Sequence, residues 1–276
     1  MVSVITGVVF GLVPALQATK TDLVSSLKDV ASQSGTRRSW LRSSLVVAQI
    51  AVSLLLLVAA GLTLRALQQL RTLNPGFNPE NAVMMSFDLS LQGYQTDAGS
   101  QLRKQLLNRI ESLPGVQTAS LTNFMPLSMN YNGTAVFIEG QPQERGANAP
   151  NAMNADVGSK YFESIGTPLL AGRDLTEQDQ QGKTRSVVVN ETFARRFFSG
   201  PNWPGANPNE NALGKRFRTS PDREPWQIAG VAKDGKYWTI GEEPKPFIWF
   251  PLGNQLAFNT LVVRTNVRPE SVIGAI

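Results

Sequence analysis

The 276-residue sequence predicts a membrane protein with two transmembrane α-helices and an α+β extracytoplasmic domain. Three observations predict this fold class: two long uncharged stretches near the N-terminus, basic residues concentrated between them, and mixed strand and helix patterns in the rest of the chain. Charged residues make up 17% of the sequence, below the roughly 25% typical of soluble domains, which also favours membrane segments.

The composition excludes several classes of enzyme and binding protein. There is no His and no Cys, so a Ser-His-Asp triad, a thiol nucleophile, a Cys-based zinc site and a disulfide framework are all absent. The formal net charge is +5, and the first 65 residues hold +4 of it. A nucleic-acid-binding protein would carry this excess on its folded domain, so we expect no nucleic-acid partner and favour a membrane.

The clearest membrane segment covers residues 43–64, which are uncharged and lie between Arg42 and Arg65. At about 1.5 Å per residue this helix reaches roughly 33 Å, enough to cross a hydrocarbon core of about 30 Å. Gln49 is tolerable if it faces another helix. The alternative is a buried core helix, but such helices seldom run this long without a charged position.

Residues 1–18 are expected to form the other transmembrane helix. A signal peptide is the main alternative, but no basic region precedes the apolar run. Pro14 bends or ends this helix, and Gly7 and Gly11 form a G-x-x-x-G pair that would let a second helix approach. Two incidental glycines explain that pair equally well.

The short segment between these helices sets the orientation. Residues 19–42 contain five cations and two acids, so the positive-inside rule places them in the cytoplasm. Arg37, Arg38 and Trp40 suit a basic and aromatic interfacial anchor. Residues 65–276 then form an extracytoplasmic core domain, and the whole is a multi-pass protein of the inner membrane.

The first part of that domain predicts a β-α-β-β subdomain. Residues 83–91 alternate between apolar and polar in the manner of a half-buried strand. A helix is expected over residues 102–113, ended by Pro114-Gly115, with strands at 116–123 and 134–139 and a loop at 140–151. Its apolar face comprises Leu102, Leu106, Leu107, Ile110 and Leu113, while Arg103, Lys104 and Glu111 lie elsewhere.

The second part, from about residue 152, predicts a mostly β subdomain with few helices. A short helix with Tyr161, Phe162 and Ile165 should end at Gly166. Asn190 is expected to cap a helix over residues 191–198, followed by a surface loop at 200–211. The expected strands are 169–170, 186–189, 215–218, 227–231, 247–250 and 261–264.

Two sequence patterns have features of phosphate or metal sites. Gly182-Lys183-Thr184 resembles the end of a phosphate-binding loop, but Glu177 occupies the place of the required glycine, so a solvated turn is expected. Asp174, Glu177 and Asp179 form an acidic cluster in a polar loop without a metal-ligand pattern, and we expect a surface cluster.

Other candidate positions have structural explanations as well. Asn132 and Asn190 begin Asn-x-Thr patterns for glycosylation, but Asn190 has the capping role given above. The aromatic pairs Phe197-Phe198 and Tyr237-Trp238 would line a binding surface or, by default, pack in the core. We therefore predict no catalytic, cofactor-binding or metal-binding residues and no cofactor, and the substrate-binding residues stay unknown.

Several stretches resemble the permeases of the macrolide-exporter and lipoprotein-releasing ABC transporter superfamily. GVVFGLVPALQATKTDLVSSLKD (7–29) is similar to the last helix of such a permease, and LRSSLVVAQIAVSLLLLVAAGLTLRAL (41–67) to the first helix of a permease unit. Further similar stretches, in the family's order, are YFESIGTPLLAGRDLTEQD (161–179), SVVVNETFARRFF (186–198), ALGKRFR (212–218) and WQIAGVAKDGKYW (226–238).

This resemblance implies an acidobacterial-type duplicated permease, with the end of one half leading into the periplasmic core domain of the next. It implies a porter-like first subdomain and a non-enzymatic role, in which a cytoplasmic ATPase subunit drives motion of the outer domain for export or efflux. A periplasmic adaptor or an outer-membrane channel are further candidate partners. Because a helix begins near Pro269 and three family helices are missing, we expect an internal fragment with a truncated domain. The alternatives are a binding or regulatory protein that controls a cell-envelope enzyme and, less favoured, a membrane-anchored enzyme.

Overall fold

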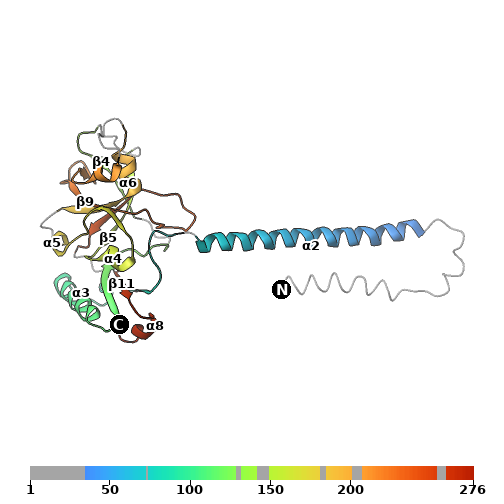
Figure 1. The fold of residues 1–276 in the computed structure, drawn as a ribbon, viewed down its shortest axis with the longest axis horizontal. Coiled ribbons are helices and arrows are strands. Elements are labelled where there is room, and N and C mark those ends of the chain that lie inside the picture. Colours follow the sequence, from blue (N-terminus) through green and yellow to red (C-terminus); the bar gives the residue numbers. More distant parts are fainter. Residues whose placement is uncertain are drawn as a thin grey trace. The chain divides into compact units, whose positions relative to one another are not determined.

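The structure, a computed structural model, describes residues 35–72, 74–128, 132–141, 149–180, 185–200, 207–253 and 259–276. Its internal contacts form two units that divide between Arg71 and Thr72. The first unit contributes one described element, the long helix α2 (Gly35–Thr72), and the second is the α+β domain (Figure 1).

Helix α2 confirms an apolar helix on the N-terminal side of the domain. Its stretch Ser43–Gln68 is long and apolar enough to cross a membrane, and none of that stretch is buried inside the protein. The helix begins at Gly35, so the end of the predicted loop 19–42 is helical, because no Gly or Pro interrupts residues 36–60. The other predicted span, residues 1–18, lies outside the described residues, as do residues 19–34.

The domain contains both helices and strands, as predicted, and is built on a mixed β-sheet. Nine strands follow the order β1-β11-β2-β5-β10-β7-β9-β8-β4, with β3 paired to β5 and β6 paired to β9. The β5–β10 and β7–β9 pairs are parallel and the others are antiparallel. The strands are β1 (Ala82–Phe87), β2 (Val116–Thr122), β3 (Gly133–Ala135), β4 (Phe137–Ile138), β5 (Asn151–Val157), β6 (Leu169–Gly172), β7 (Ser186–Asn190), β8 (Arg216–Arg218), β9 (Trp226–Ala232), β10 (Phe247–Pro251) and β11 (Asn259–Thr265).

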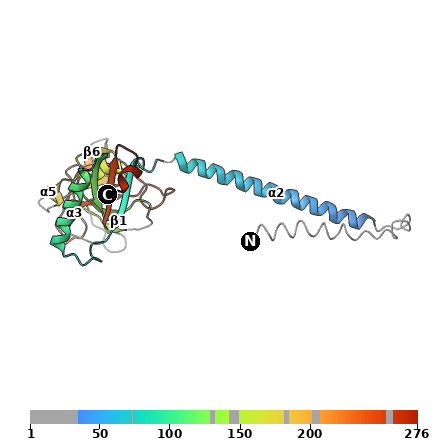
Figure 2. The same cartoon turned by 90° about the horizontal axis from the view of Figure 1, so that it is seen from below.

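Helices cover both faces of the β2–β11 part of the sheet (Figures 1 and 2). Ile110 of α3 packs with Leu121 and Leu261 on one face. Ser164 of α4 meets Thr118 on the other face, with 3.0 Å between their hydroxyl oxygens. The domain helices are α3 (Thr96–Glu111), α4 (Tyr161–Ile165), α5 (Glu177–Gln180), α6 (Glu191–Phe197), α7 (Pro208–Ala212) and α8 (Glu270–Ile273).

Arg103 differs from its predicted place on α3, because it is only 6% exposed. Its guanidinium donates to the carbonyl oxygen of Gly253 at 3.0 Å and to Asn259 Oδ1 at 3.4 Å. These bonds explain how a cation is accommodated beneath the helix, and burial lowers the pKa of Arg103.

The first predicted subdomain has a different strand pairing from the one expected. The C-terminal strand β11 lies between β1 and β2, so both ends of the domain's chain meet in its sheet. The predicted strand 134–139 is divided at Val136, because β3 pairs with β5 while β4 pairs with β8. Strand β1 is also shorter than predicted, and Leu91 is 81% exposed. One sheet therefore runs through both predicted groups.

The second group agrees with the local signals in the sequence. Gly166 ends α4 with φ 73°, and the Asn190 side chain caps α6 by accepting from the Phe193 N–H. Strand β5 was missed, because its sequence NAMNADV lacks the expected alternation. The predicted loop 200–211 contains the start of α7, where Pro208 occupies the first turn and Asn207 caps the helix.

Candidate coupling site at the entry to the domain

The acidic cluster predicted to lie on the surface contains one buried, ion-paired residue, Asp179. Asp179 is 2% exposed and forms a bidentate ion pair with Arg173, with nitrogen–oxygen distances of 2.7 and 3.2 Å. The Thr176 N–H and hydroxyl also donate to Asp179 Oδ2. Glu177 is exposed and Asp174 is half-buried. The surface expectation was therefore wrong for Asp179, and the described part of the chain brings no three His, Cys, Asp or Glu together as metal ligands.

The other candidate patterns divide between the core and the surface. Asn190 is fully buried, so the second Asn-x-Thr pattern is inaccessible in the folded domain, whereas Asn132 is exposed. Residues Phe197, Phe198 and Tyr237 are buried as expected, but Trp238 is 40% exposed. The triplet at 182–184 lies outside the described residues.

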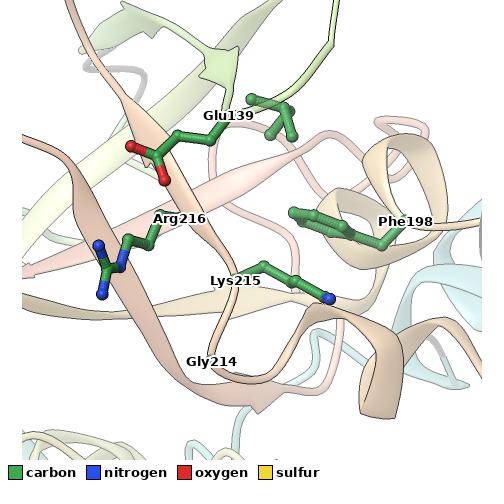
Figure 3. Close-up of a pocket in the computed structure, with 6 residues that line it drawn as sticks. Glu139, Phe198, Gly214, Lys215 and Arg216 are labelled. Atoms are coloured by element: carbon green, nitrogen blue, oxygen red, sulfur yellow. The ribbon is translucent and has the colours of Figure 1, made fainter.

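A hollow of about 280 Å³ lies beside β8, and Figure 3 shows its lining. Lys215 and Arg216 supply positive charge, while Glu139 supplies negative charge and is paired with Arg218 at 3.1 Å. The charges in this hollow are mixed, and its lining contains two cations and one carboxylate.

The most distinctive arrangement of polar groups surrounds residues 74–81, which we call the entry segment because they lead the chain from α2 into β1. Its backbone is bonded to three separate parts of the domain. The Pro75 carbonyl accepts from the Lys236 N–H at 2.8 Å, and the Asn78 N–H donates to the Ile165 carbonyl at 3.1 Å. The Thr265 N–H donates to the Asn81 carbonyl at 2.9 Å. The entry segment is therefore fixed to the core along its length.

The local sequence of the entry segment suits this path. The Asn74 side chain accepts from the Gly76 N–H at 2.8 Å, which closes a tight turn. Gly76 has φ 84°, and a Cβ atom there would lie 2.2 Å from the Asp234 carbonyl oxygen. Only glycine allows the segment to lie this close to residues 234–235.

A buried arginine from the last strand holds the entry segment from beneath. Arg264 is 7% exposed, and its guanidinium donates to the carbonyl oxygens of Ser164 at 3.1 Å, Asn78 at 2.9 Å and Glu80. Ser164 lies at the C-terminal end of α4, where helix carbonyls favour a cation. Burial lowers the pKa of Arg264, and these three carbonyl oxygens compensate for its lost hydration.

The loop that receives Pro75 is itself held by Asn190. The Asn190 Oδ1 atom accepts from the Phe193 and Phe247 N–H groups at 2.9 and 2.8 Å. Its Nδ2 atom donates to Asp234 Oδ1 at 2.7 Å and to the Lys245 carbonyl at 2.8 Å. Thus the predicted helix cap has a second role, which is to fix residues 234–236 against the sheet.

Two half-buried carboxyl groups elsewhere in the domain give it a pH dependence. Burial raises the pKa of both Asp156 and Asp174 to about 6, above the ordinary value near 3.9. The folded state then binds protons more tightly than the unfolded state, so stability should rise as the pH falls from 7.5 to 5. We expect a higher Tm at pH 5, and a smaller rise in the variant carrying Asp156→Asn and Asp174→Asn. An equal rise in both proteins would contradict the assignment.

Comparison with known proteins relates most of the chain to one family. The family model described as the MacB-like periplasmic core domain matches residues 43–276. The macrolide export ATP-binding/permease protein MacB of Aggregatibacter actinomycetemcomitans is 32% identical over 78 residues, which are 28% of this chain. The matched region covers only 10% of that relative's own length.

Two solved structures are also similar to the chain. The periplasmic region of MacB from Actinobacillus actinomycetemcomitans is 17% identical, with a TM-score of 0.45, over 72% of this chain and 82% of that one. The extracellular domain of the noncanonical ABC-type transporter YknZ from Gram-positive bacteria is 13% identical, with a TM-score of 0.39, over 70% and 86%. The family match covers most of the sequence, and the chain belongs to the MacB-like periplasmic core domain family.

Proposed function

We propose that the chain is part of an ABC transporter permease for export or efflux, in which the core domain responds outside the membrane to ATP hydrolysis inside it. The observation that carries this proposal is the fixed entry segment. Because the entry segment is hydrogen-bonded to residues 165, 236 and 265, a displacement of this segment would move the core of the domain with it. A flexible linker would absorb the same displacement.

The strand order supports the same role. Ala82, at the start of β1, is paired with Arg264 near the end of β11. The chain therefore enters the sheet beside its last strand, and Arg264 binds the entry segment and α4 together. Movement of residues 74–81 would act directly on the strand that lies between β1 and β2.

The arrangement of the complete protein belongs to the same proposal. Residues 1–18 and 43–64 are two spans of a duplicated, multi-pass inner-membrane permease, residues 19–42 are cytoplasmic, and residues 65–276 are extracytoplasmic. ATP hydrolysis would come from a separate cytoplasmic subunit, with an adaptor or an outer-membrane channel as further partners. The alternative of controlling a cell-envelope enzyme uses the same coupling, and a hydrolase encoded next to the permease would favour it over export.

The proposed orientation is testable because the chain contains no Cys. Single cysteines at Ser32 and Ser220 should differ in their labelling when the outer membrane is permeabilised and the inner membrane is intact. An impermeant thiol reagent should label Ser220→Cys and leave Ser32→Cys unlabelled until the inner membrane is opened. The reverse pattern would show that the five cations of residues 19–42 lie outside.

A further inference from the structure

Two large apolar side chains project from the loop that holds the entry segment. Trp238 is 40% exposed and Ile240 is 38% exposed. They lie two and four residues after Lys236, whose N–H is bonded to the Pro75 carbonyl. The loop is well fixed, since Glu242 Oε1 accepts from the Trp238 N–H at 3.2 Å and the Lys236 ammonium donates to the Glu242 carbonyl. These side chains are therefore presented by a defined backbone.

A strained backbone position lies against the same loop. Leu127 has φ 63°, a left-handed conformation that costs a non-glycine residue roughly 1 kcal/mol. Its N–H donates to the Tyr237 carbonyl at 2.7 Å, immediately before Trp238. Met125, Pro126 and Leu127 are themselves half-exposed and apolar. Strain of this kind is frequently retained where a surface has a function.

Chain length sets an upper limit on the distance between the entry segment and the end of the apolar stretch. The apolar stretch of α2 ends at Gln68, and the helix ends at Thr72. Seven residues lead from Gln68 to Pro75. Four helical and three fully extended residues span at most about 17 Å. The headgroup layer is about 5–7 Å thick. Trp238 is two residues beyond Lys236, so it can reach the headgroup region.

The chemistry of the loop suits that region. Trp is enriched at membrane interfaces because its ring is apolar and its N–H is polar. The Lys245 ammonium lies 5.0 Å from the centre of the Trp238 ring, where it can meet a lipid phosphate. We propose that Trp238 and Ile240, supported by Lys245, form a contact between the core domain and the anionic lipid interface.

This contact rests on the proposed span at residues 43–64. One experiment distinguishes failure of the contact from failure of the span. The full chain is placed in nanodiscs of phosphatidylcholine and phosphatidylglycerol, with an environment-sensitive fluorophore on a single Cys at position 240. Lipids carrying a nitroxide on the headgroup or at a shallow acyl carbon serve as quenchers. A Cys at Leu91, which is 81% exposed on the β1–α3 connection, is the matched control, and a Cys at Leu56 reports on the span.

We expect quenching at Ile240→Cys to be at least about threefold stronger than at Leu91→Cys, and to fall when Trp238→Asp is added. Equal quenching at 240 and 91, with strong acyl quenching at Leu56→Cys, would overturn the lipid contact while leaving the span in place. Loss of quenching at Leu56→Cys would instead refute the span and the contact with it. Efficient disulfide formation between two copies through position 240, without lipid quenching, would assign the surface to a second copy and overturn the proposal.

Discussion

Replacing Arg264 with methionine is expected to lower the free energy of unfolding of the core domain by about 3–4 kcal/mol. Methionine occupies a similar volume but leaves the carbonyl oxygens of Ser164, Asn78 and Glu80 without their donor. Each buried polar group left unpaired costs about 1–3 kcal/mol. Thermal and urea unfolding of the purified chain, followed by circular dichroism, measure this loss.

Two further variants distinguish these hydrogen bonds from a general effect of charge. Arg268 lies four residues later and is exposed, so Arg268→Met should change the free energy of unfolding by less than about 0.5 kcal/mol. Arg264→Lys retains the charge but cannot donate to all three carbonyl oxygens in the same way. Its free energy of unfolding should lie between those of Arg264→Met and Arg268→Met. If Arg264→Met were as stable as Arg268→Met, the arginine would not hold the entry segment.

Asn190→Leu is expected to lower the free energy of unfolding by a similar amount, about 3–4 kcal/mol. This side chain makes four hydrogen bonds while fully buried, and leucine leaves two backbone N–H groups and the Lys245 carbonyl without partners. The helix α6 also loses its cap, which is part of the same cost.

The structural consequence of Asn190→Leu should extend to the entry segment. Hydrogen exchange at the Lys236 amide, which is bonded to Pro75, should become faster than in the unaltered chain. Asn132→Leu is the matched control, since that asparagine begins the same Asn-x-Thr pattern but is exposed. Equal stability of the two variants would show that the Asn190 side chain does not hold residues 234–236 in place.

Local signals in the sequence predicted the helices and strands that depend on neighbouring residues. The uncharged run at 43–64 is a signal in consecutive residues, and the glycine that ends α4 and the asparagine that caps α6 act within one or two turns. Strand β5 lacked such a signal, because the polar residues of NAMNADV do not alternate regularly with the apolar ones. Its pairing with β2, β3 and β10 forms the strand instead.

The candidate site depended on contacts between distant parts of the sequence. Arg264 contacts residues about 100 and 185 positions earlier, and no pattern within β11 indicates which carbonyls it binds. A cation in the otherwise apolar run LVVRT was the available signal, since a charged residue in a buried strand requires partners. Asp179 was misplaced for a related reason: its acidic neighbours resembled a surface loop, whereas Arg173 pairs with it in the fold.

The proposed coupling is tested most directly by interrupting the connection between α2 and the entry segment in the intact transporter. A Gly-Ser-Gly insertion between Leu73 and Asn74 would make the connection flexible, while the same insertion between Pro221 and Asp222, in the turn between β8 and β9, is the control. A donor dye on a Cys at Leu91 and acceptor lipids in the bilayer report displacement of the domain when ATP and vanadate are added.

We predict that energy transfer changes with ATP and vanadate in the unaltered transporter and in the control. The insertion after Leu73 should abolish this change, while the rate of ATP hydrolysis, measured without vanadate, stays the same. The Tm of the domain should be the same in all three proteins. An ATP-driven change that survives the insertion after Leu73 would show that motion reaches the domain by another route, and it would contradict the proposed coupling.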